Sequence, residues 1–276
     1  MAGSAPSARA VSRGRIQLAT GGGTDGRSVR ARPWHVCFVR AIITAAGRGS
    51  RLVSSSDDTP KTLLRFGSGT ILSGIMQNFA AAGISEFIVI VGFRGEAIVE
   101  YLTANGNLGY AVSVVRNPEW QRGNGISVHL AGTVLDPDEE VLLSMSDHLV
   151  SPAALRAMIE APAGRNQLLV DPRIELVHDL EDATKVWVDA GRITRIGKEL
   201  ADFNAVDCGV FRLTRRYFDA MGRQIGKGRD SITEGVRELI AADDFEAVPI
   251  PASSHWIDID TPAAYEHATA NRARYG

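Results

Sequence analysis

Short apolar runs and longer segments with helical spacing alternate along the chain from residue 40 onward. Short apolar runs predict strands over 41–46, 86–92, 111–117 and 139–147, and the first two are expected to be buried. Apolar residues spaced three and four apart predict helices over 70–83, 94–105, 125–135 and 151–161. The run FIVIV has no polar alternation, which is typical of a strand covered on both faces. Strands that alternate with helices in this way predict an α/β domain with a largely parallel sheet.

A different pattern begins after about residue 165. Shorter, hairpin-like runs predict strands over 167–172, 184–198 and 205–213, and a last strand over 254–261. Helices are expected over 215–223, 230–242 and 262–273. We therefore expect one domain over residues 40–276, with a Rossmann-like, mixed and mostly parallel sheet flanked by helices and a β-rich insertion.

The first 39 residues have a different composition from the rest. They are rich in Gly, Ala, Ser and Arg, and Asp25 is their one acid. Such a segment cannot bury a core, so we expect a disordered extension or the product of an upstream translation start. A chain that begins at Val39 is expected to fold and to keep its activity.

Composition limits the class of protein. The net charge is −2, and a charge this close to zero does not indicate nucleic-acid binding. The two cysteines, Cys37 and Cys208, fit no metal or redox spacing, which favours a reducing cytoplasm. No apolar run approaches the roughly 20 residues of a membrane helix, so a membrane partner is not expected.

A glycine-rich, basic loop follows the first predicted strand. In a doubly wound sheet, ligands bind beyond the carboxyl ends of the strands, and Gly47 and Gly49 allow a close backbone approach to phosphate oxygens. Arg51 and Lys61 add positive charge. The loop lacks the G-K-[ST] of a Walker A motif, and Leu52 replaces the third glycine of the dinucleotide fingerprint. Taken alone, it could equally be an ordinary strand-to-helix turn.

The full stretch AAGRGSRL, followed after a short gap by PK, resembles the signature of nucleotidyltransferases that join a nucleoside triphosphate to a phosphorylated sugar or alcohol. The matching residues are Gly47, Gly49, Arg51, Leu52, Pro60 and Lys61. The resemblance implies that the loop wraps a triphosphate, with Ala45 and Ala46 leading into it and the two cations offsetting its charge.

Acidic residues follow two predicted strands. Asp147 ends one strand, while Asp258 and Asp260 lie in WIDIDTP, where alternate residues of a strand share a face. The residues alone leave open a turn or a helix cap. The resemblance implies that Asp147 and an acid of the last strand hold Mg²⁺. Asp258 aligns best with that acid, while Asp260 is the second choice and could instead cap the helix that begins near Thr261.

A polar segment, RNPEWQRGNGISVHLA, resembles the part of cytidylyl-transferring members that lies along the base. Asn124 and Ser127 are the matching polar groups, and an amide and a hydroxyl can pair with the edge of cytosine. A simple turn at Asn124 and a helix cap at Ser127 remain the alternative.

The motifs DATKV, IGK, NAVDCGVF, MSDH and WIDIDTP closely resemble inositol-1-phosphate cytidylyltransferases. This resemblance runs from about residue 40 to 267. It implies a fold of the nucleotide-diphospho-sugar transferase type and Mg²⁺-dependent transfer from CTP to inositol 1-phosphate. Lys185, in DATKV, is the expected ligand of the acceptor phosphate. Other acceptors (phosphocholine, aminoethylphosphonate, a hexose 1-phosphate), a catalytically inactive nucleotide-sensing module and a homodimer all stay open.

Overall fold

The structure, a computed structural model, describes residues 40–49, 51–52 and 59–276. The expectations for residues 1–39 and for Cys37 therefore lie outside the described residues. The described residues all fall within one compact unit, Phe38–Gly276.

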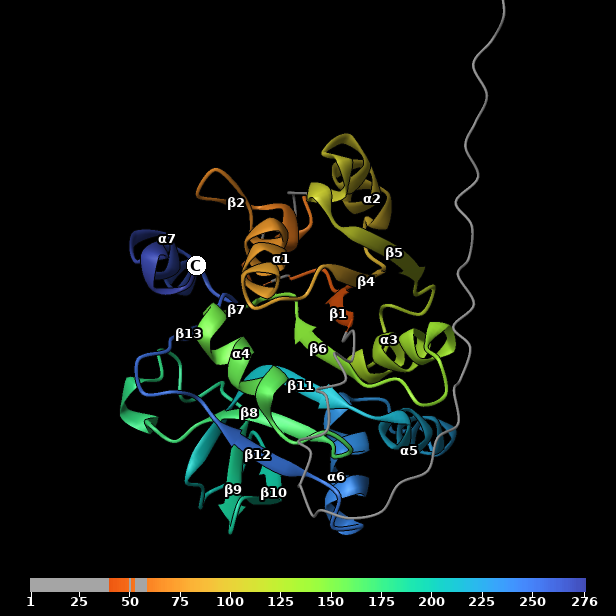
Figure 1. Cartoon of the computed structure of the whole chain (residues 1–276), viewed down its shortest axis with the longest axis vertical. Helices are drawn as coiled ribbons and strands as arrows, with labels where there is room; N and C mark the ends of the chain where they lie inside the picture. Colours follow the sequence, from red (N-terminus) through yellow and green to blue (C-terminus); the bar gives the residue numbers. More distant parts are fainter. Residues whose placement is uncertain (1–39, 50, 53–58) are drawn as a thin grey trace, which may run out of the picture. The chain divides into compact units, whose positions relative to one another are not determined.

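A mixed sheet of nine strands, in the order β5-β4-β1-β6-β11-β8-β12-β10-β9, runs through the described residues (Figure 1). Its first four strands are mutually parallel: β5 (Ala111–Arg116), β4 (Glu86–Val91), β1 (Arg40–Ala45) and β6 (Val141–Met145). The remaining strands are β11 (Ala205–Leu213), β8 (Gln167–Asp171), β12 (Glu246–Pro249), β10 (Arg192–Gly197) and β9 (Lys185–Asp189).

Antiparallel pairings predominate in this second half. β11 runs antiparallel to β6, β8 and β9, and β10 runs antiparallel to β9 and β12, while β12 is parallel to β8. The expected mixed sheet is confirmed, but the parallel arrangement is limited mainly to the first four strands. The β-rich segment that we expected as an insertion contributes its strands to the same sheet.

The last predicted strand does not join the main sheet. It is β13 (Trp256–Asp258), which pairs antiparallel with the short β7 (His148–Val150). In that pairing Asp258 lies opposite His148. A second small ladder joins β2 (Arg65–Phe66) to β3 (Gly69–Thr70).

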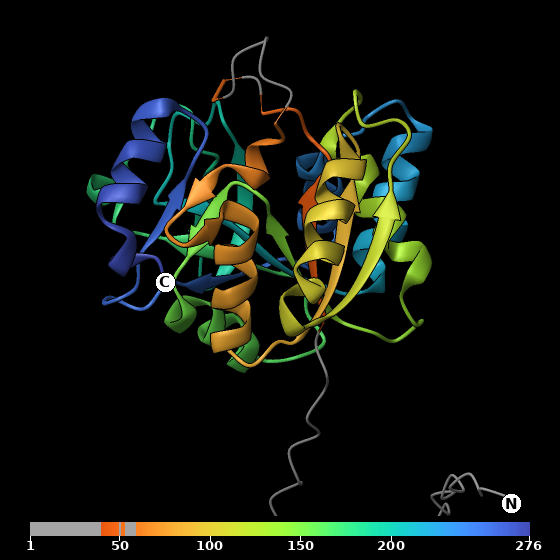
Figure 2. The same cartoon turned by 90° about the horizontal axis from the view of Figure 1, so that it is seen from above.

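Helices cover both faces of the main sheet (Figures 1 and 2). They are α1 (Ile71–Ala81), α2 (Gly95–Ala104), α3 (Asn124–Ala131), α4 (Pro152–Glu160), α5 (Arg215–Gly226), α6 (Ile232–Ala241) and α7 (Pro262–Ala270). Short 3₁₀ helices span Lys61–Leu63, Gly106–Gly109, Gly132–Val134, Ile174–Leu176 and Arg272–Arg274. The predicted helix over 125–135 is therefore α3 followed by a 3₁₀ turn.

The alternation of side chains along the central strand explains this layering. Ala41 and Ile43 of β1 pack in one core with residues of α1, α2, α4 and α7, whereas Ile42 packs in a second core with residues of α3, α5 and α6. All three side chains are fully buried, so both faces of this strand are covered. Among the described helices, none has the length and apolar character that would span a bilayer.

Candidate active site

Three chain segments meet at one edge of the sheet. β1 and β6 are parallel neighbours, with Thr44 opposite Met145, so the glycine-rich loop and Asp147 emerge side by side. The segment after β13 is tied to the same place, because the Ile259 N–H donates to the carbonyl of Asp147 at 2.8 Å. The edge therefore combines the loop that carries the basic residues with all three candidate metal acids.

Gly49 gives the glycine-rich loop its close packing. Its φ is +68°, and a Cβ at this position would lie 2.7 Å from the Cβ of Lys61. A side chain there would displace Lys61, which is only 6% exposed. Gly47 faces open space, since a Cβ there would meet no atom of the described residues within 4 Å. The glycines thus fulfil separate requirements: one lets the lysine pack and the other leaves room beside the loop.

Lys61 and Arg51 lie among the acids. Lys61 Nζ is 2.8 Å from Asp147 Oδ2 and also pairs with Asp260. Arg51 pairs with Asp260 and, at 2.5 Å, with Asp182. Burial opposes the charge of Lys61, but Asp147 and Asp260 outweigh it and raise the pKa of Lys61 above its usual value. The lysine is therefore a fixed positive charge at the ends of the strands.

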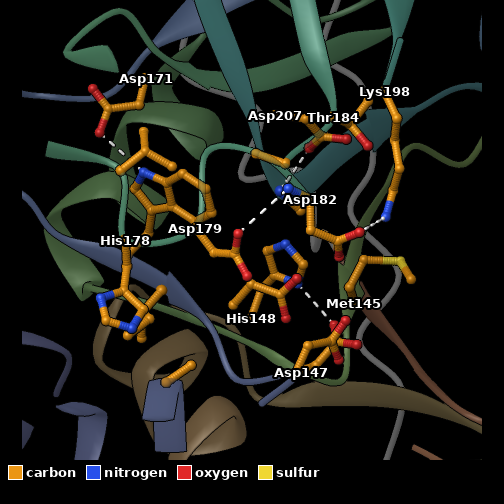
Figure 3. Close-up of a pocket in the computed structure, with 18 of the residues that line it drawn as sticks. Met145, Asp147, His148, Asp171, His178, Asp179, Asp182, Thr184, Lys198 and Asp207 are labelled. Carbon is orange, nitrogen blue, oxygen red and sulfur yellow. Dashed lines mark hydrogen bonds and ion pairs between the residues drawn. The ribbon is translucent and has the colours of Figure 1, made fainter. Parts of the chain in front are cut away.

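Asp147 is held from its other side by a histidine. His148 Nδ1 lies 2.8 Å from Asp147 Oδ1 (Figure 3). Burial favours the neutral acid, but Lys61 and His148 outweigh it and keep the pKa of Asp147 well below its usual value. Burial also opposes the charge of His148, but Asp258 and Asp147 raise the pKa of His148 to about 9. Asp147 is thus an ionised carboxylate at neutral pH.

The acids fit a divalent cation. Carboxylate or ring ligand atoms of Asp147, His148 and Asp258 lie within 4.8 Å of one another, and so do those of Asp182, Asp258 and Asp260. Asp258 belongs to both groups, and within the described part of the chain its buried Oδ1 has no hydrogen-bond partner. Burial raises the pKa of Asp258 to about 7, opposed by His148. A buried carboxylate oxygen without a donor suits a hard cation such as Mg²⁺.

The alternative role for Asp260 is wrong. The cap of α7 is Thr261, whose side chain accepts a hydrogen bond from the Ala264 N–H. The Asp260 carboxylate instead pairs with Lys61 and Arg51. Asp260 therefore lies in the same charged cluster as Asp147 and Asp258.

Two cavities open at this cluster. The larger cavity, about 670 Å³, has walls from β10, β11, β13, α6, α7 and the segment between β8 and β9. The smaller cavity, about 320 Å³, is bounded by the glycine-rich loop, Lys61 and the start of α3. Both cavities contact Arg51, Asn124, Met145, Asp147 and Asp260. Two small molecules bound in these cavities would therefore meet at the charged cluster.

Asn124 and Ser127 both line the smaller cavity. Asn124 Oδ1 accepts a hydrogen bond from the Ile232 N–H at 3.0 Å, which holds the amide in place. Ser127 lies within α3, and its Oγ accepts a hydrogen bond from Asn117 Nδ2 at 2.9 Å. The alternative reading of Ser127 as a helix cap is wrong, because α3 begins at Asn124 and Ser127 lies within it.

A stacked pair of rings forms part of the wall of the larger cavity. His148 stacks on Trp256 with ring centroids 5.9 Å apart and an interplanar angle of 4°. Trp256 Nε1 donates to Asp171 Oδ2 at 2.9 Å, and Arg173 Nε donates to Asp171 Oδ1 at 2.8 Å. Gly209 closes the other side, because a Cβ there would lie 2.3 Å from the His148 ring. The wall is therefore closely packed and built from strands distant in sequence.

The chain matches, over residues 41–178, the family model described as a MobA-like NTP transferase domain. It belongs to this family. A relative named bifunctional IPC transferase and DIPP synthase, from Rubrobacter xylanophilus, is 32% identical over 225 residues, which are 81% of this chain and 50% of the relative. The protein of the same name from Aquifex aeolicus is 28% identical, over 83% of this chain and 50% of its own. The chain thus spans about half the length of these curated relatives.

The solved structure of the inositol-1-phosphate CTP transferase from T. maritima is similar to this chain. The TM-score is 0.74 at 27% identity, and the match covers 83% of this chain and 91% of that one. The expected nucleotide-diphospho-sugar transferase type of fold is confirmed by this similarity.

The two lysines of the β9–β10 hairpin, Lys185 and Lys198, occupy different places relative to the cavities. Lys185 Nζ donates to the carbonyl of Glu181 at 2.9 Å, and this nearly buried lysine does not line either cavity. Lys198, directly after β10, lines the larger cavity and pairs with Asp182 at 2.7 Å (Figure 3). The structure therefore brings Lys198, rather than Lys185, to the cavity next to the acids.

Several residues of the cavities were not expected from the sequence. They are His148, Asp171, Arg173, Asp182, Lys198 and Asp207. Four of them lie in motifs that we had already singled out: His148 in MSDH, Asp182 in DATKV, Lys198 in IGK and Asp207 in NAVDCGVF. The others depend on which strands pair, so the local sequence carried little signal for them.

Proposed function

We propose that this protein transfers a cytidylyl group from CTP to inositol 1-phosphate, giving CDP-inositol and pyrophosphate. The observation that carries the proposal is the meeting of two cavities at one cluster of acids and cations. CTP would occupy the smaller cavity and the phosphorylated acceptor the larger one. The similarity to the T. maritima transferase, over 91% of that chain, supports the choice of substrates.

In the proposed reaction, an oxygen of the acceptor phosphate attacks the α-phosphorus of CTP. The new P–O bond forms as the bond to the bridging oxygen breaks, and pyrophosphate leaves with that electron pair. Chemistry of this kind depends mainly on positioning and charge. Lys61 and Arg51 would offset the charge that develops on the pyrophosphate. Mg²⁺ held by Asp147 and Asp258 would supply further neutralisation between the two anions.

The base would lie beside the start of α3. Asn124 and Ser127 offer an amide and a hydroxyl on the wall of the smaller cavity. A site that pairs with the exocyclic amine of cytosine leaves polar groups unmatched by uracil, and a purine needs a deeper pocket. We therefore expect CTP to be preferred over UTP, ATP and GTP.

For the acceptor phosphate, we propose Lys198 as the main protein ligand. It is a cation on the wall of the larger cavity, and its partner Asp182 also binds Arg51. If the acceptor phosphate replaced Asp182 as the partner of Lys198, the ammonium group would keep an anionic partner while the substrate binds. Lys185, our expectation from the sequence, remains the alternative that mutation can test.

The test is a measurement of pyrophosphate release with Mg²⁺, the four nucleoside triphosphates and a set of acceptors. The acceptors are inositol 1-phosphate, glucose 1-phosphate, phosphocholine and 2-aminoethylphosphonate. We expect the highest kcat/KM for CTP with inositol 1-phosphate, and almost none in Asp147→Asn, which is nearly isosteric but lacks the charge. A higher value for another acceptor would replace inositol 1-phosphate in the proposal. Binding of CTP without turnover of any acceptor would instead favour a nucleotide-sensing module.

A further inference from the structure

The carboxylates on the wall of the larger cavity differ in how fully their hydrogen-bonding capacity is used. Cations pair with four of them, namely Asp147, Asp171, Asp182 and Asp260. The carboxylate of Asp171 accepts bonds from an arginine and a tryptophan. Within residues 40–49, 51–52 and 59–276, the Asp207 carboxylate accepts a hydrogen bond from the Gly209 N–H at 2.6 Å. Asp207 therefore has acceptor capacity left for a ligand.

A break in β11 directs Asp207 to the cavity. The pairing of β11 with β8 loses register between Asp207 and Phe211, where Gly209 adopts a φ of +74°. The irregular strand lets Asp207 line the larger cavity within a strand that is otherwise nearly buried (Figure 3). The position is thus set by the backbone and not by a flexible loop.

The charge state of Asp207 suits a hydrogen-bond acceptor. Burial raises the pKa of Asp207 to about 6, opposed by the Gly209 N–H and the charge of His148. Near pH 7.5 the group is therefore mainly ionised and can only accept hydrogen bonds. A ligand without hydrogen-bond donors would displace water from this buried carboxylate and provide no hydrogen bond in return. Binding of such a ligand is therefore disfavoured.

We propose that Asp207 accepts hydrogen bonds from ring hydroxyl groups of the acceptor, and so selects polyol phosphates over phosphate esters without hydroxyls. This inference rests on the proposed function and assigns a residue to acceptor choice. The aromatic side chains of the described wall offer no cage for a quaternary ammonium group. Phe211 and Tyr275 are nearly buried, and Trp256 is stacked on a histidine.

The test compares two acceptors that differ in their hydroxyl groups: inositol 1-phosphate and cyclohexyl phosphate. Wild type should use inositol 1-phosphate far better. Asp207→Leu should lower kcat/KM for inositol 1-phosphate at least about tenfold, because a hydrogen bond to a charged group is lost. The same variant should leave kcat/KM for cyclohexyl phosphate within about twofold and the KM for CTP unchanged. Asp202→Asn, an exposed aspartate before β11, is the control and should match wild type with both acceptors.

The outcomes separate the inference from the function on which it rests. Equal losses with both acceptors in Asp207→Leu, or in the more conservative Asp207→Asn, would assign the residue to packing and overturn the inference. Equal use of both acceptors by wild type would also overturn it, while cytidylyl transfer itself would stand. Absence of pyrophosphate release from wild type with every acceptor would remove the proposed function, and the inference with it.

Discussion

Replacement of Lys61 by methionine should destabilise the protein in a way that Mg²⁺ relieves. The lysine is nearly buried and its ammonium lies between Asp147 and Asp260. Methionine fills a similar volume but carries no charge. The variant therefore leaves two carboxylates close together without their shared counter-ion.

The size of the effect follows from this geometry. Removal of one partner of a buried ion pair costs about 3–5 kcal/mol. Arg51 still pairs with Asp260, although its side chain is 52% exposed, so we expect the lower end of that range. For a domain of this length, about 3 kcal/mol corresponds to a fall in Tm of roughly 6–12 °C. A divalent cation between the acids would restore much of the lost charge balance, so saturating Mg²⁺ should shrink the difference.

The assay is thermal unfolding of wild type and Lys61→Met in EDTA and in saturating Mg²⁺. Lys227→Met, at an exposed lysine after α5, is the control and should unfold with wild type in both buffers. If Lys61→Met unfolds within about 2 °C of wild type in EDTA, the acids do not depend on the lysine. An equal fall in Tm with and without Mg²⁺ would show that packing, and not charge, causes the loss.

Three further predictions follow from the same cluster and from the cavity walls. Asp258→Asn should lower turnover by orders of magnitude and weaken Mg²⁺ binding in a direct titration, while Asp260→Asn should have the smaller effect; equal, small losses would contradict the metal assignment. Lys198→Met should raise the KM for inositol 1-phosphate at least about tenfold and leave the KM for CTP unchanged, whereas the same loss in Lys185→Met would restore the assignment made from the sequence. Burial opposes the charge of Asp171, but hydrogen bonds from the neighbouring arginine hold the pKa of Asp171 below its usual value. The contribution of the ionised Asp171 carboxylate to stability is therefore complete above its pKa in the unfolded chain, about 4. It is lost as the pH falls through the lower pKa of Asp171 in the folded protein. The Tm of Asp171→Asn should accordingly lie below that of wild type at pH 7 and converge with it in acid.

The sequence predicted the part of the site that depends on local rules. A glycine-rich loop after a buried strand and an acid after a second parallel strand must meet at one edge of the sheet, which placed Gly49, Lys61 and Asp147 together. The spacing of Asp258 and Asp260 also placed both acids near one another. These expectations needed only the strand ends and the direction of the strands.

The rest depended on pairings that the local sequence does not record. β12 is four residues long and ends in proline, so it was not recognised, although it forms an inner strand of the sheet. The short β7 gave no signal of its own, and its pairing removed β13 from the main sheet. In the β9–β10 hairpin Lys185 lies opposite Gly197, so two lysines are close in space and only the final packing decides which reaches the cavity. The register break that orients Asp207 is equally invisible in a run of strand-forming residues.

The small β7–β13 ladder has a consequence for the order of events during biosynthesis. It joins Asp258 to His148, next to Asp147, so the acids come together only through chain segments about a hundred residues apart. At a synthesis rate of roughly 5–20 residues per second, Asp258 leaves the ribosome's catalytic centre roughly 5–20 seconds after Asp147. During that interval the nascent chain can already contain β1, β4, β5 and β6, whose pairings are complete without the later segment. A growing chain would therefore hold much of its sheet before it could hold a metal ion, and Mg²⁺ would stabilise only the last stage of folding.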